Sequence, residues 1–446
     1  MQRRGQNRGG WESFIEKRER IMMLCSAVRT WLCRLLILLV VAASADAAET
    51  SDASSTSRFG ADTPGGRGGA IIRVTNLDAA GPGSLRAALE TAGPRIVVFE
   101  VAGVIDLNRR SLRIVEPRVT VAGQTAPSPG ITLIRGGLTI ATHDVIVHHL
   151  RIRPGDAGQP RRSGWEPDGI STAGSSAHDI LIEHCSTTWA TDENLSVSGP
   201  RLEGPEGTSR RVTIRNCLIA ECLHDSTHAK GPHSMGSLIH DFCQQIAIIG
   251  NLYAHNHQRN PYFKAHTTGV IVNNVIYNPG RYAIQLGFAP SEWIGARYLP
   301  RPPRLSIVGN VYLQGTDTRA GLPMVDRPGE VYLSDNIALD REGQPVAVAG
   351  AIVQQLDEKP VWPEGLEPLT ADQVLEHVIR HVGARPRDRD PIDQRIIQQL
   401  IDGEGKIIHS QDEVGGYPEV EPVHRPLQVP DADVQRWLDQ MAADLQ

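Results

Sequence analysis

Short apolar runs, each closed by a polar turn residue, recur through the middle of the chain. The runs are rich in Val and Ile and are followed at once by Asn or His. The closing residues are spaced by 35, 32, 35, 23, 36 and 26 positions, and they are His149, His184, Asn216, Asn251, Asn274, Asn310 and Asn336. No unit of this kind can bury its apolar side alone, so neighbouring units must stack into a solenoid.

The composition of the repeat indicates strands rather than helices. β-branched residues dominate the runs, and they favour strands over helices. Asn tolerates left-handed backbone geometry, and stacked Asn side chains can form hydrogen bonds along a solenoid. A β-propeller is the main alternative, but its blades need longer repeats with several hairpins each. The pattern therefore predicts an all-β parallel β-helix over residues 69–343.

The pattern changes at both ends of the chain. A short apolar run at 35–43 is followed by small residues at A-x-A spacing, which is typical of a secretory signal peptide within residues 1–47. The run is too short to span a bilayer comfortably, so no stable membrane span is expected after cleavage at Ala47. Residues 48–68 are rich in Ser, Thr, Asp and Gly, and we expect a flexible leader there.

Beyond residue 343 the strand pattern gives way to helical spacing. Helix signals, including a Thr cap and an Asp-Pro start, occur at 369–378, 390–397 and 432–438. We expect this C-terminal extension, residues 344–446, to cap the solenoid or to run along it. It is not expected to form a catalytic domain of its own.

The charge of the chain restricts its partners. The full chain has a net charge of −6. Removing residues 1–47 takes away 8 Lys and Arg and 4 Asp and Glu, which leaves 37 against 47, or −10. An acidic surface argues against nucleic acid as a partner. An acidic substrate stays possible, because a local cationic cleft can outweigh the global charge.

Four cysteines remain after the expected cleavage. Cys185 and Cys217 close similar apolar runs, so stacked thiols and disulfides are both compatible with the pattern. Four cysteines in some 400 residues do not make a disulfide scaffold. A zinc site is not expected, since the chain has no C-x-x-C pair.

Three carboxylates stand at turns that lie about one repeat apart: Asp168, Asp192 and Glu193. Stacked turns would bring them together, where they could share a hard cation such as Ca²⁺, which takes six to eight oxygen ligands. The alternative, favoured by spacing alone, is a solvated acidic rim.

Cations follow further along the chain. Arg259 lies near His255, His257 and Lys264, and Lys230 and His233 share a turn that is crowded with hydrogen-bond donors. An isolated surface cation is the ordinary explanation for any one of them. Acids and cations on one face of a solenoid would nevertheless suit an anionic ligand bridged by a metal.

Several motifs together resemble the pectate lyases of the first polysaccharide lyase family. Gly81-Pro82-Gly83-Ser84-Leu85-Arg86-Ala87-Ala88 is similar to the family's entry motif, and Asp168-Gly169-Ile170 to its first calcium-binding turn. Ile182-Glu183-His184-Cys185-Ser186 resembles the I-D-H-C-S signature, with Glu in place of Asp. Arg259-Asn260-Pro261 matches R-x-P, the motif of the family's catalytic arginine.

The resemblance implies a right-handed, single-stranded parallel β-helix that is monomeric and secreted and that cleaves α-1,4-linked polygalacturonate. Cleavage would proceed by β-elimination with Arg259 as base and would give a 4,5-unsaturated product. Bound Ca²⁺ would acidify the C5 proton by holding the uronate carboxylate. The implied calcium ligands are Asp168, Asp192 and Glu193, and the implied substrate-binding residues are Lys230, His233 and Lys264, the last where the family carries a second arginine.

An arginine base requires a special environment. The reference pKa of arginine is about 12.5–13.8. Only neighbouring cations and loss of water can favour its neutral form. We therefore expect an alkaline pH optimum.

Two other functions are compatible with such a solenoid. A non-catalytic β-helix could bind polysaccharide, but binding alone does not need Arg259 together with Asp168 and Asp192. A glycoside hydrolase needs two carboxylates placed as acid and base. The chain carries no Asp-Asp pair of the kind that polygalacturonases use, so hydrolysis is the weakest alternative.

Overall fold

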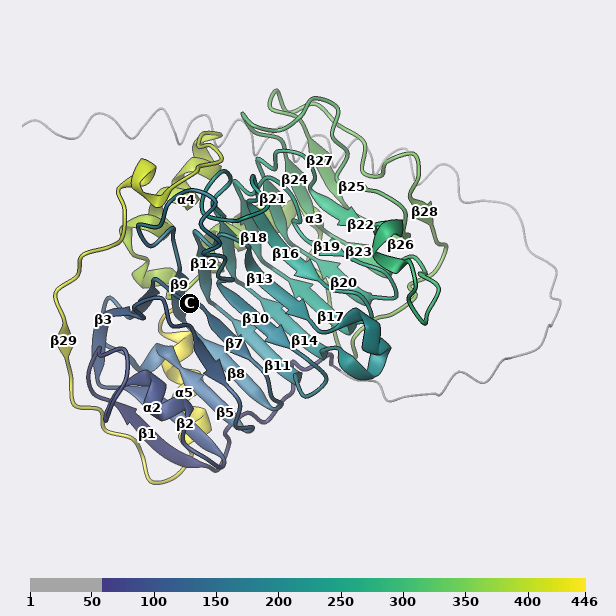
Figure 1. Ribbon diagram of the computed structural model, residues 1–446. Coiled ribbons are helices and arrows are strands. Elements are labelled where there is room, and N and C mark those ends of the chain that lie inside the picture. The colour runs from purple at the N-terminus through teal and green to yellow at the C-terminus, as the bar shows by residue number, and fades with distance from the viewer. Residues whose placement is uncertain (1–57) are drawn as a thin grey trace, which may run out of the picture.

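The computed structural model of the chain describes residues 58–446 (Figure 1). The predicted signal peptide and the first part of the leader, residues 48–57, lie outside these residues. From Arg58 onward the leader lies against the solenoid: Phe59 is buried, and its carbonyl accepts a hydrogen bond of 2.9 Å from the Thr213 hydroxyl.

Three long sheets, wound from successive coils, build the molecule (Figure 1). The 11-stranded sheet consists of β1 (Ala70–Val74), β2 (Arg95–Phe99), β5 (Val119–Ala122), β8 (Val145–His148), β11 (His178–Glu183), β14 (Arg210–Arg215), β17 (Gln244–Ile249), β20 (Thr268–Val272), β23 (Arg304–Val308), β26 (Glu330–Ser334) and β28 (Gln354–Gln355). The 8-stranded sheet consists of β4 (Leu112–Ile114), β7 (Leu138–Ile140), β10 (Ile170–Ala173), β13 (Glu193–Ser198), β16 (Met235–Ile239), β19 (Tyr262–Phe263), β22 (Ile284–Leu286) and β25 (Val325–Asp326).

The 10-stranded sheet completes each coil. It consists of β3 (Val101–Asp106), β6 (Ile131–Ile134), β9 (Leu150–Arg153), β12 (Ser186–Thr188), β15 (Leu218–Ala220), β18 (Leu252–Ala254), β21 (Val275–Tyr277), β24 (Val311–Leu313), β27 (Ile337–Leu339) and β29 (Val423–His424). All pairings between these strands are parallel except that of β29 with β3. The predicted parallel β-helix is confirmed.

The asparagine stack predicted from the repeat is present. Asn251 donates from Nδ2 to Oδ1 of Asn274 at 2.9 Å, and the pairs Asn274–Asn310 and Asn310–Asn336 follow at 3.0 Å each. The same oxygens also accept backbone amides, for example Asn274 Oδ1 that of Asn251 at 2.9 Å. The corner between the first and third sheets is therefore held by buried, satisfied amides.

We expected all seven polar residues that close the apolar runs to stack in one column. In the first coils of the repeat, however, these residues lie one position earlier than in the later coils. Ser186 pairs with Leu218, and Leu218 pairs with Leu252, so Cys185, Cys217 and Asn251 share one column. His184 and Asn216 occupy the preceding column, whose residues have positive φ. The polar residues that we aligned belong to two adjacent columns, because either position of this corner can carry the polar side chain.

The cysteines of the described chain are free and buried, and they are Cys185, Cys217, Cys222 and Cys243. Of the two possibilities left open by the sequence, stacked thiols are the one observed. Burial raises the pKa of the Cys217 thiol well above its ordinary value, so this group stays protonated.

The predicted helices form near their expected positions. α3 (Ala371–His381) and α4 (Pro391–Asp402) bury Val374, Val378 and Ile396 on the outer face of the 10-stranded sheet. α5 (Val434–Ala443) returns to the opposite end, where Leu438 packs on Ile96 and Val98 of β2. α2 (Leu85–Leu89) lies at the N-terminal end of the core (Figure 1). Short 3-10 turns are η1 (Gly123–Thr125), η2 (Arg201–Gly207), η3 (Pro290–Trp293), η4 (Pro386–Asp388) and η5 (Gln411–Val414).

Buried charges attach α4 to the solenoid. Asp390 caps the helix by accepting the Asp393 amide, and both carboxylates face Arg153 of β9. Arg153 is fully buried and donates to Asp393 at 2.8 Å, while the Ser186 hydroxyl donates to the same carboxylate at 2.6 Å. In the described part of the chain no helix is long and apolar enough to cross a membrane.

Candidate active site

Three carboxylates meet where two strands of the 8-stranded sheet begin. Ile170 of β10 pairs with Leu195 of β13, which places Asp168 and Glu193, each two residues earlier, side by side. Asp192 precedes Glu193 directly. One oxygen from each of the three carboxylates lies within 4.8 Å of the others. The stacking of turns thus unites the predicted acidic set instead of leaving it as a dispersed rim.

The three carboxylates have different electrostatic environments. Asp168 accepts the Glu193 amide at 3.1 Å and the Ser196 hydroxyl at 2.8 Å, yet burial, followed by the charge of Asp192, raises its pKa to about 6. Burial raises the pKa of Glu193 well above its ordinary value, although Arg259 opposes this shift. The cluster therefore has more negative charge than its surroundings neutralise, and its oxygen ligands fit a hard divalent cation.

Asp192 is distinguished by two histidines. His233 Nε2 lies 3.0 Å from its Oδ1 and His228 Nε2 lies 3.6 Å away, with the two rings stacked at 3.6 Å. Burial alone would raise the pKa of Asp192, but the hydrogen bond and charge of His233 bring it below its ordinary value. Asp192 is thus the member of the cluster that ionises most readily.

The tautomer of His228 decides whether this histidine can bind a metal together with Asp192 and His233. The Lys230 amide donates to His228 Nδ1 at 3.1 Å, so the neutral ring carries its proton on Nε2, facing Asp192. Burial lowers the pKa of His228, which keeps the ring neutral. Although Asp192, His228 and His233 lie close enough together to hold a metal, a proton on Nε2 argues against His228 as a metal ligand through that atom.

Arg259 reaches the cluster from the loop between β18 and β19. Its guanidinium forms an ion pair with Oε1 of Glu193, and its Cζ lies 5.8 Å from the centre of the Tyr262 ring. The side chain retains 21% exposure, so it lies at the edge of the carboxylate cluster, accessible from outside. The structure therefore brings the predicted base into direct contact with Glu193, one of the three predicted metal ligands.

A second asparagine ladder, not foreseen from the sequence, lies behind these residues. Asn194 donates to Asn256 at 3.1 Å, and Asn256 donates to Asn260 at 3.1 Å, all three being buried. Asn194 follows Glu193 and Asn260 follows Arg259, so the ladder fixes the backbone of both charged residues. Glu193 and Arg259 are each followed directly by Asn, and this shared pattern is the feature of the sequence that could have predicted the second ladder.

Lys264 is placed differently from the other predicted substrate-binding residues. Its ammonium is buried and lies 2.5 Å from Glu292 and 3.4 Å from Asp241. Arg201 joins the same carboxylates at 2.9 and 2.6 Å. Lys264 is thus paired twice within the protein, whereas Lys230 lies exposed in its turn.

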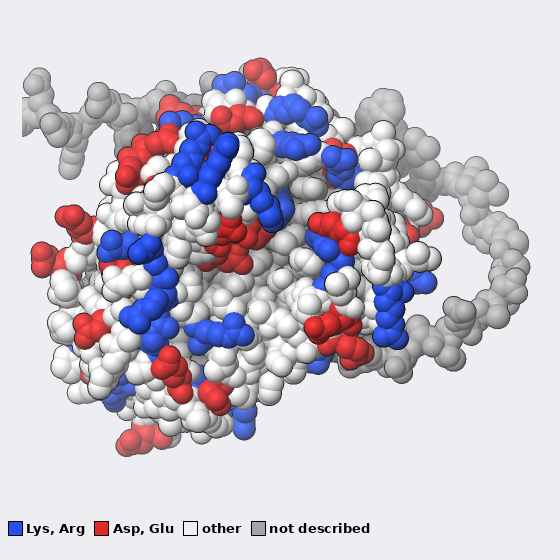
Figure 2. Space-filling model, in the orientation of Figure 1, with Lys and Arg blue, Asp and Glu red and all other residues white. Residues whose placement is uncertain are grey.

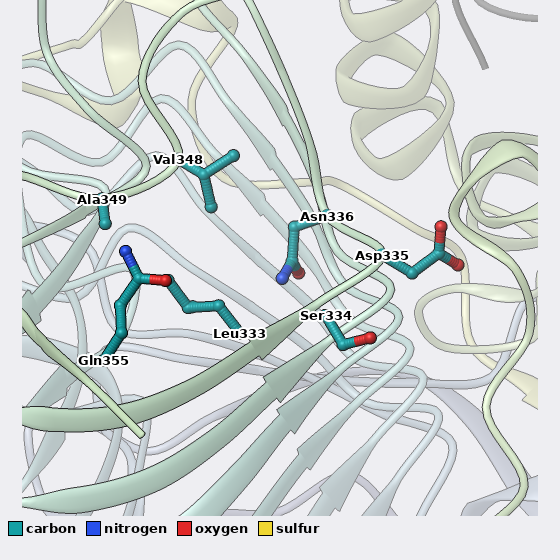
Figure 3. Close-up of a pocket in the computed structure, with 7 residues that line it drawn as sticks. All are labelled: Leu333, Ser334, Asp335, Asn336, Val348, Ala349 and Gln355. Atoms are coloured by element: carbon teal, nitrogen blue, oxygen red, sulfur yellow. The ribbon is translucent and has the colours of Figure 1, made fainter. Parts of the chain in front are cut away.

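The charged cluster lies on an open face and not in an enclosed cavity. Figure 2 shows acidic side chains gathered near the middle of the face that presents β13 and β16, with basic side chains beside them. A hollow of about 390 Å³ lies at the C-terminal end of the solenoid, lined by residues of β26 and β28 and of the segments 335–336 and 348–349 (Figure 3). None of the predicted site residues lines it, and we assign it no role in the site.

Solved structures with this architecture define the class of the protein. The chain is similar to the major cedar pollen allergen Jun a 1, with a TM-score of 0.53 and 18% identity over 73% of this chain and 92% of that one. It is also similar to a pectate lyase bound to a hexasaccharide, with a TM-score of 0.50 and 13% identity over 74% and 97%. The chain is therefore a right-handed parallel β-helix protein, as expected from the resemblance.

Curated relatives show the family. The chain is 31% identical over 372 residues to probable pectate lyase C of Emericella nidulans, covering 80% of this chain and 78% of the relative. It is 32% identical over 372 residues to probable pectate lyase C of Aspergillus terreus, with 80% and 79% covered. No family model matches the chain. The protein belongs to the pectate lyases, and it is a polysaccharide lyase.

Proposed function

We propose that the protein cleaves α-1,4-polygalacturonate by calcium-dependent β-elimination, leaving a 4,5-unsaturated sugar. The observation that carries the proposal is the direct contact between Arg259 and a cluster of three carboxylates on an open face of the solenoid. Mere polysaccharide binding, the alternative weighed above, does not call for three clustered carboxylates with an arginine in contact with one of them.

Asp168, Asp192 and Glu193 would hold the calcium ion. The raised pKa values of Asp168 and Glu193 reflect burial and mutual repulsion, which a bound cation relieves. When bound, the ion supplies Lewis acidity toward the uronate carboxylate, which acidifies the neighbouring C5 proton. Ser196 and the Glu193 amide orient Asp168, while His233 keeps Asp192 ionised.

Arg259 would take the C5 proton through a guanidinium nitrogen. The Asn194–Asn256–Asn260 ladder holds its backbone, and Tyr262 packs beside the guanidinium. Because an arginine accepts a proton only when it is neutral, activity should increase above neutral pH. A rate that stops rising above pH 7 would argue against Arg259 as base.

Lys230 and His233 are the proposed contacts for further uronate groups. Lys230 is exposed beside the cluster, and His233 lies between the Lys230 turn and Asp192. Lys264 is also a proposed substrate contact, but its ammonium is already paired with Glu292 and Asp241. To bind a uronate its ammonium must exchange Glu292 or Asp241 for the ligand.

The test of the proposal is the ultraviolet absorbance of the unsaturated product, measured with mature protein and polygalacturonate at alkaline pH. Absorbance that rises with added Ca²⁺ and stops with a chelator supports both the lyase chemistry and the metal. Shortened polymer without absorbance would indicate hydrolysis instead. Intact polymer with folded protein would reject polygalacturonate as the substrate.

Substitution of Arg259 by Ala tests the assigned base. We expect Arg259→Ala to lower kcat by at least about 10²-fold, the lower range for loss of a general base, while polymer binding is retained. Lys230→Ala serves as the control, and we expect it to raise KM more than it lowers kcat. Near-normal kcat in Arg259→Ala would show that another group takes the proton.

We also propose that the protein is secreted, on the basis of the signal-peptide pattern in residues 1–47. Expression of the full chain followed by N-terminal sequencing of exported protein tests this. A mature N-terminus at Ala48 is expected after cleavage at Ala47. Full-length protein retained inside the cell would contradict the proposal.

A further inference from the structure

Arg259 is the counter-ion of Glu193. The Glu193 carboxylate is buried and has two acidic neighbours, Asp168 and Asp192, so it is a costly charge to leave unpaired. Among the described residues, no ion pair of another Lys or Arg with these three carboxylates is found. The guanidinium thus balances part of the charge of the cluster from inside the protein.

The carboxylate that Arg259 pairs with belongs to the proposed metal set. Glu193 offers one carboxylate oxygen to the set that it forms with Asp168 and Asp192, and Oε1 of the same carboxylate accepts from the guanidinium. A guanidinium and a divalent cation on one carboxylate repel each other at short range, in a buried place where screening is weak. Binding of the cation to Glu193 and pairing of Glu193 with Arg259 therefore weaken each other.

We infer that Arg259 and calcium compete for Glu193, so that binding of the metal releases the catalytic arginine from an internal ion pair. This inference rests on the proposed function and extends it. A guanidinium that donates to Glu193 is not free to accept a proton from substrate. In this arrangement the metal has a second effect besides its action on the uronate, because it removes the partner that restrains Arg259.

Thermodynamic reciprocity makes the inference measurable without any turnover. If pairing with Arg259 weakens calcium binding, then removal of the guanidinium must strengthen it by the same coupling free energy. We expect calcium to bind Arg259→Ala about 10-fold or more tightly than the unchanged protein, within the usual range for coupled sites. Isothermal titration of each protein with CaCl₂ gives both affinities.

A matched control separates competition from the general effect of removing one positive charge. Lys230 lies in the neighbouring turn, but it forms no side-chain ion pair with the cluster among the described residues. We expect Lys230→Ala to change calcium affinity by less than about 2-fold, as an exposed charge does. An equal gain of calcium affinity in both variants would overturn the inference. The loss of one positive charge near the site would then explain the gain without any competition for Glu193.

The outcomes distinguish this inference from the proposed function. Unchanged or weaker calcium binding in Arg259→Ala, with normal binding in the original protein, overturns the competition alone. No calcium binding by the original protein rejects the proposed function itself. If Arg259→Ala unfolds without calcium, Arg259→Gln replaces it, and the rise of melting temperature with calcium concentration gives the affinity of the folded form.

Discussion

At the scale of single residues, the site assigns different properties to chemically similar groups. Asp168 and Asp192 lie within one cluster, yet burial raises the pKa of the first to about 6, whereas histidine contacts lower that of the second. The sequence identified both as candidate ligands but could not rank them. Ranking depends on Ser196, His228 and His233, whose positions follow from the coil geometry and not from adjacency in the chain.

The raised pKa of Asp168 predicts a pH limit for calcium binding. Below about pH 6 this carboxyl is protonated in the folded protein, so a ligand is lost, and calcium affinity should fall by up to about 10-fold per pH unit. Titration calorimetry between pH 8 and 5 measures this. Ser196→Ala removes a donor that lowers the pKa of Asp168, so the fall should begin at a higher pH. Constant affinity down to pH 5 would contradict the assignment.

The same shift has the opposite effect on stability in metal-free solution. The folded pKa of Asp168 lies above its ordinary value of 3.8, so the folded state binds the proton more tightly than the unfolded state does. The contribution of this group to the free energy of unfolding therefore increases as pH falls from about 6 toward 4.

At the scale of elements, the asparagine ladders explain both the success and the error of the repeat prediction. The periodic Asn and His residues were sufficient to identify stacked coils, because their spacing follows the coil length. They did not fix the register, since His184 and Asn216 occupy the column of positive φ while Asn251 lies in the next one. Two adjacent polar positions are indistinguishable without the pairing of the strands.

Substitution within the first ladder should be costly. Asn274→Ala leaves the Asn251 amide and the Ile248 carbonyl without their side-chain partners in the core. We expect a loss of about 2–4 kcal/mol in the free energy of unfolding, from one to three unsatisfied buried groups. Asn336→Ala at the half-buried end of the ladder is the matched control and should cost clearly less. Urea unfolding compares the two, and equal losses would refute the argument from burial.

At the scale of the whole molecule, the C-terminal extension does more than cap one end. α3 and α4 cover the 10-stranded sheet, β29 pairs with β3, and α5 reaches β2 (Figure 1). Helix signals predicted that these helices exist and that the extension caps the solenoid or runs along it. They could not predict where each one docks, because an apolar stripe specifies burial and not the partner.

Docking of α5 should contribute to global stability. Leu438 is 1% exposed against Ile96 and Val98, so Leu438→Ala is expected to cost about 2–5 kcal/mol. Leu299 is 87% exposed, and Leu299→Ala should stay within about 0.5 kcal/mol of the original protein. Hydrogen exchange should show the loss first in β2 and β5. A neutral Leu438→Ala would mean that α5 is only loosely attached.

The return of the chain from α4 to α5 has a consequence for biosynthesis. β2 and β5 leave the ribosome before the later coils, but the residues that cover them, Leu438 and its neighbours, are translated only after all of these coils. A chain released before β29 would already contain Asp168, Asp192, Glu193 and Arg259 and would still lack the cover of its first coils. Completion of the fold is thus tied to translation of α5, and products that end before α5 should be recognised by proteases at their N-terminal coils.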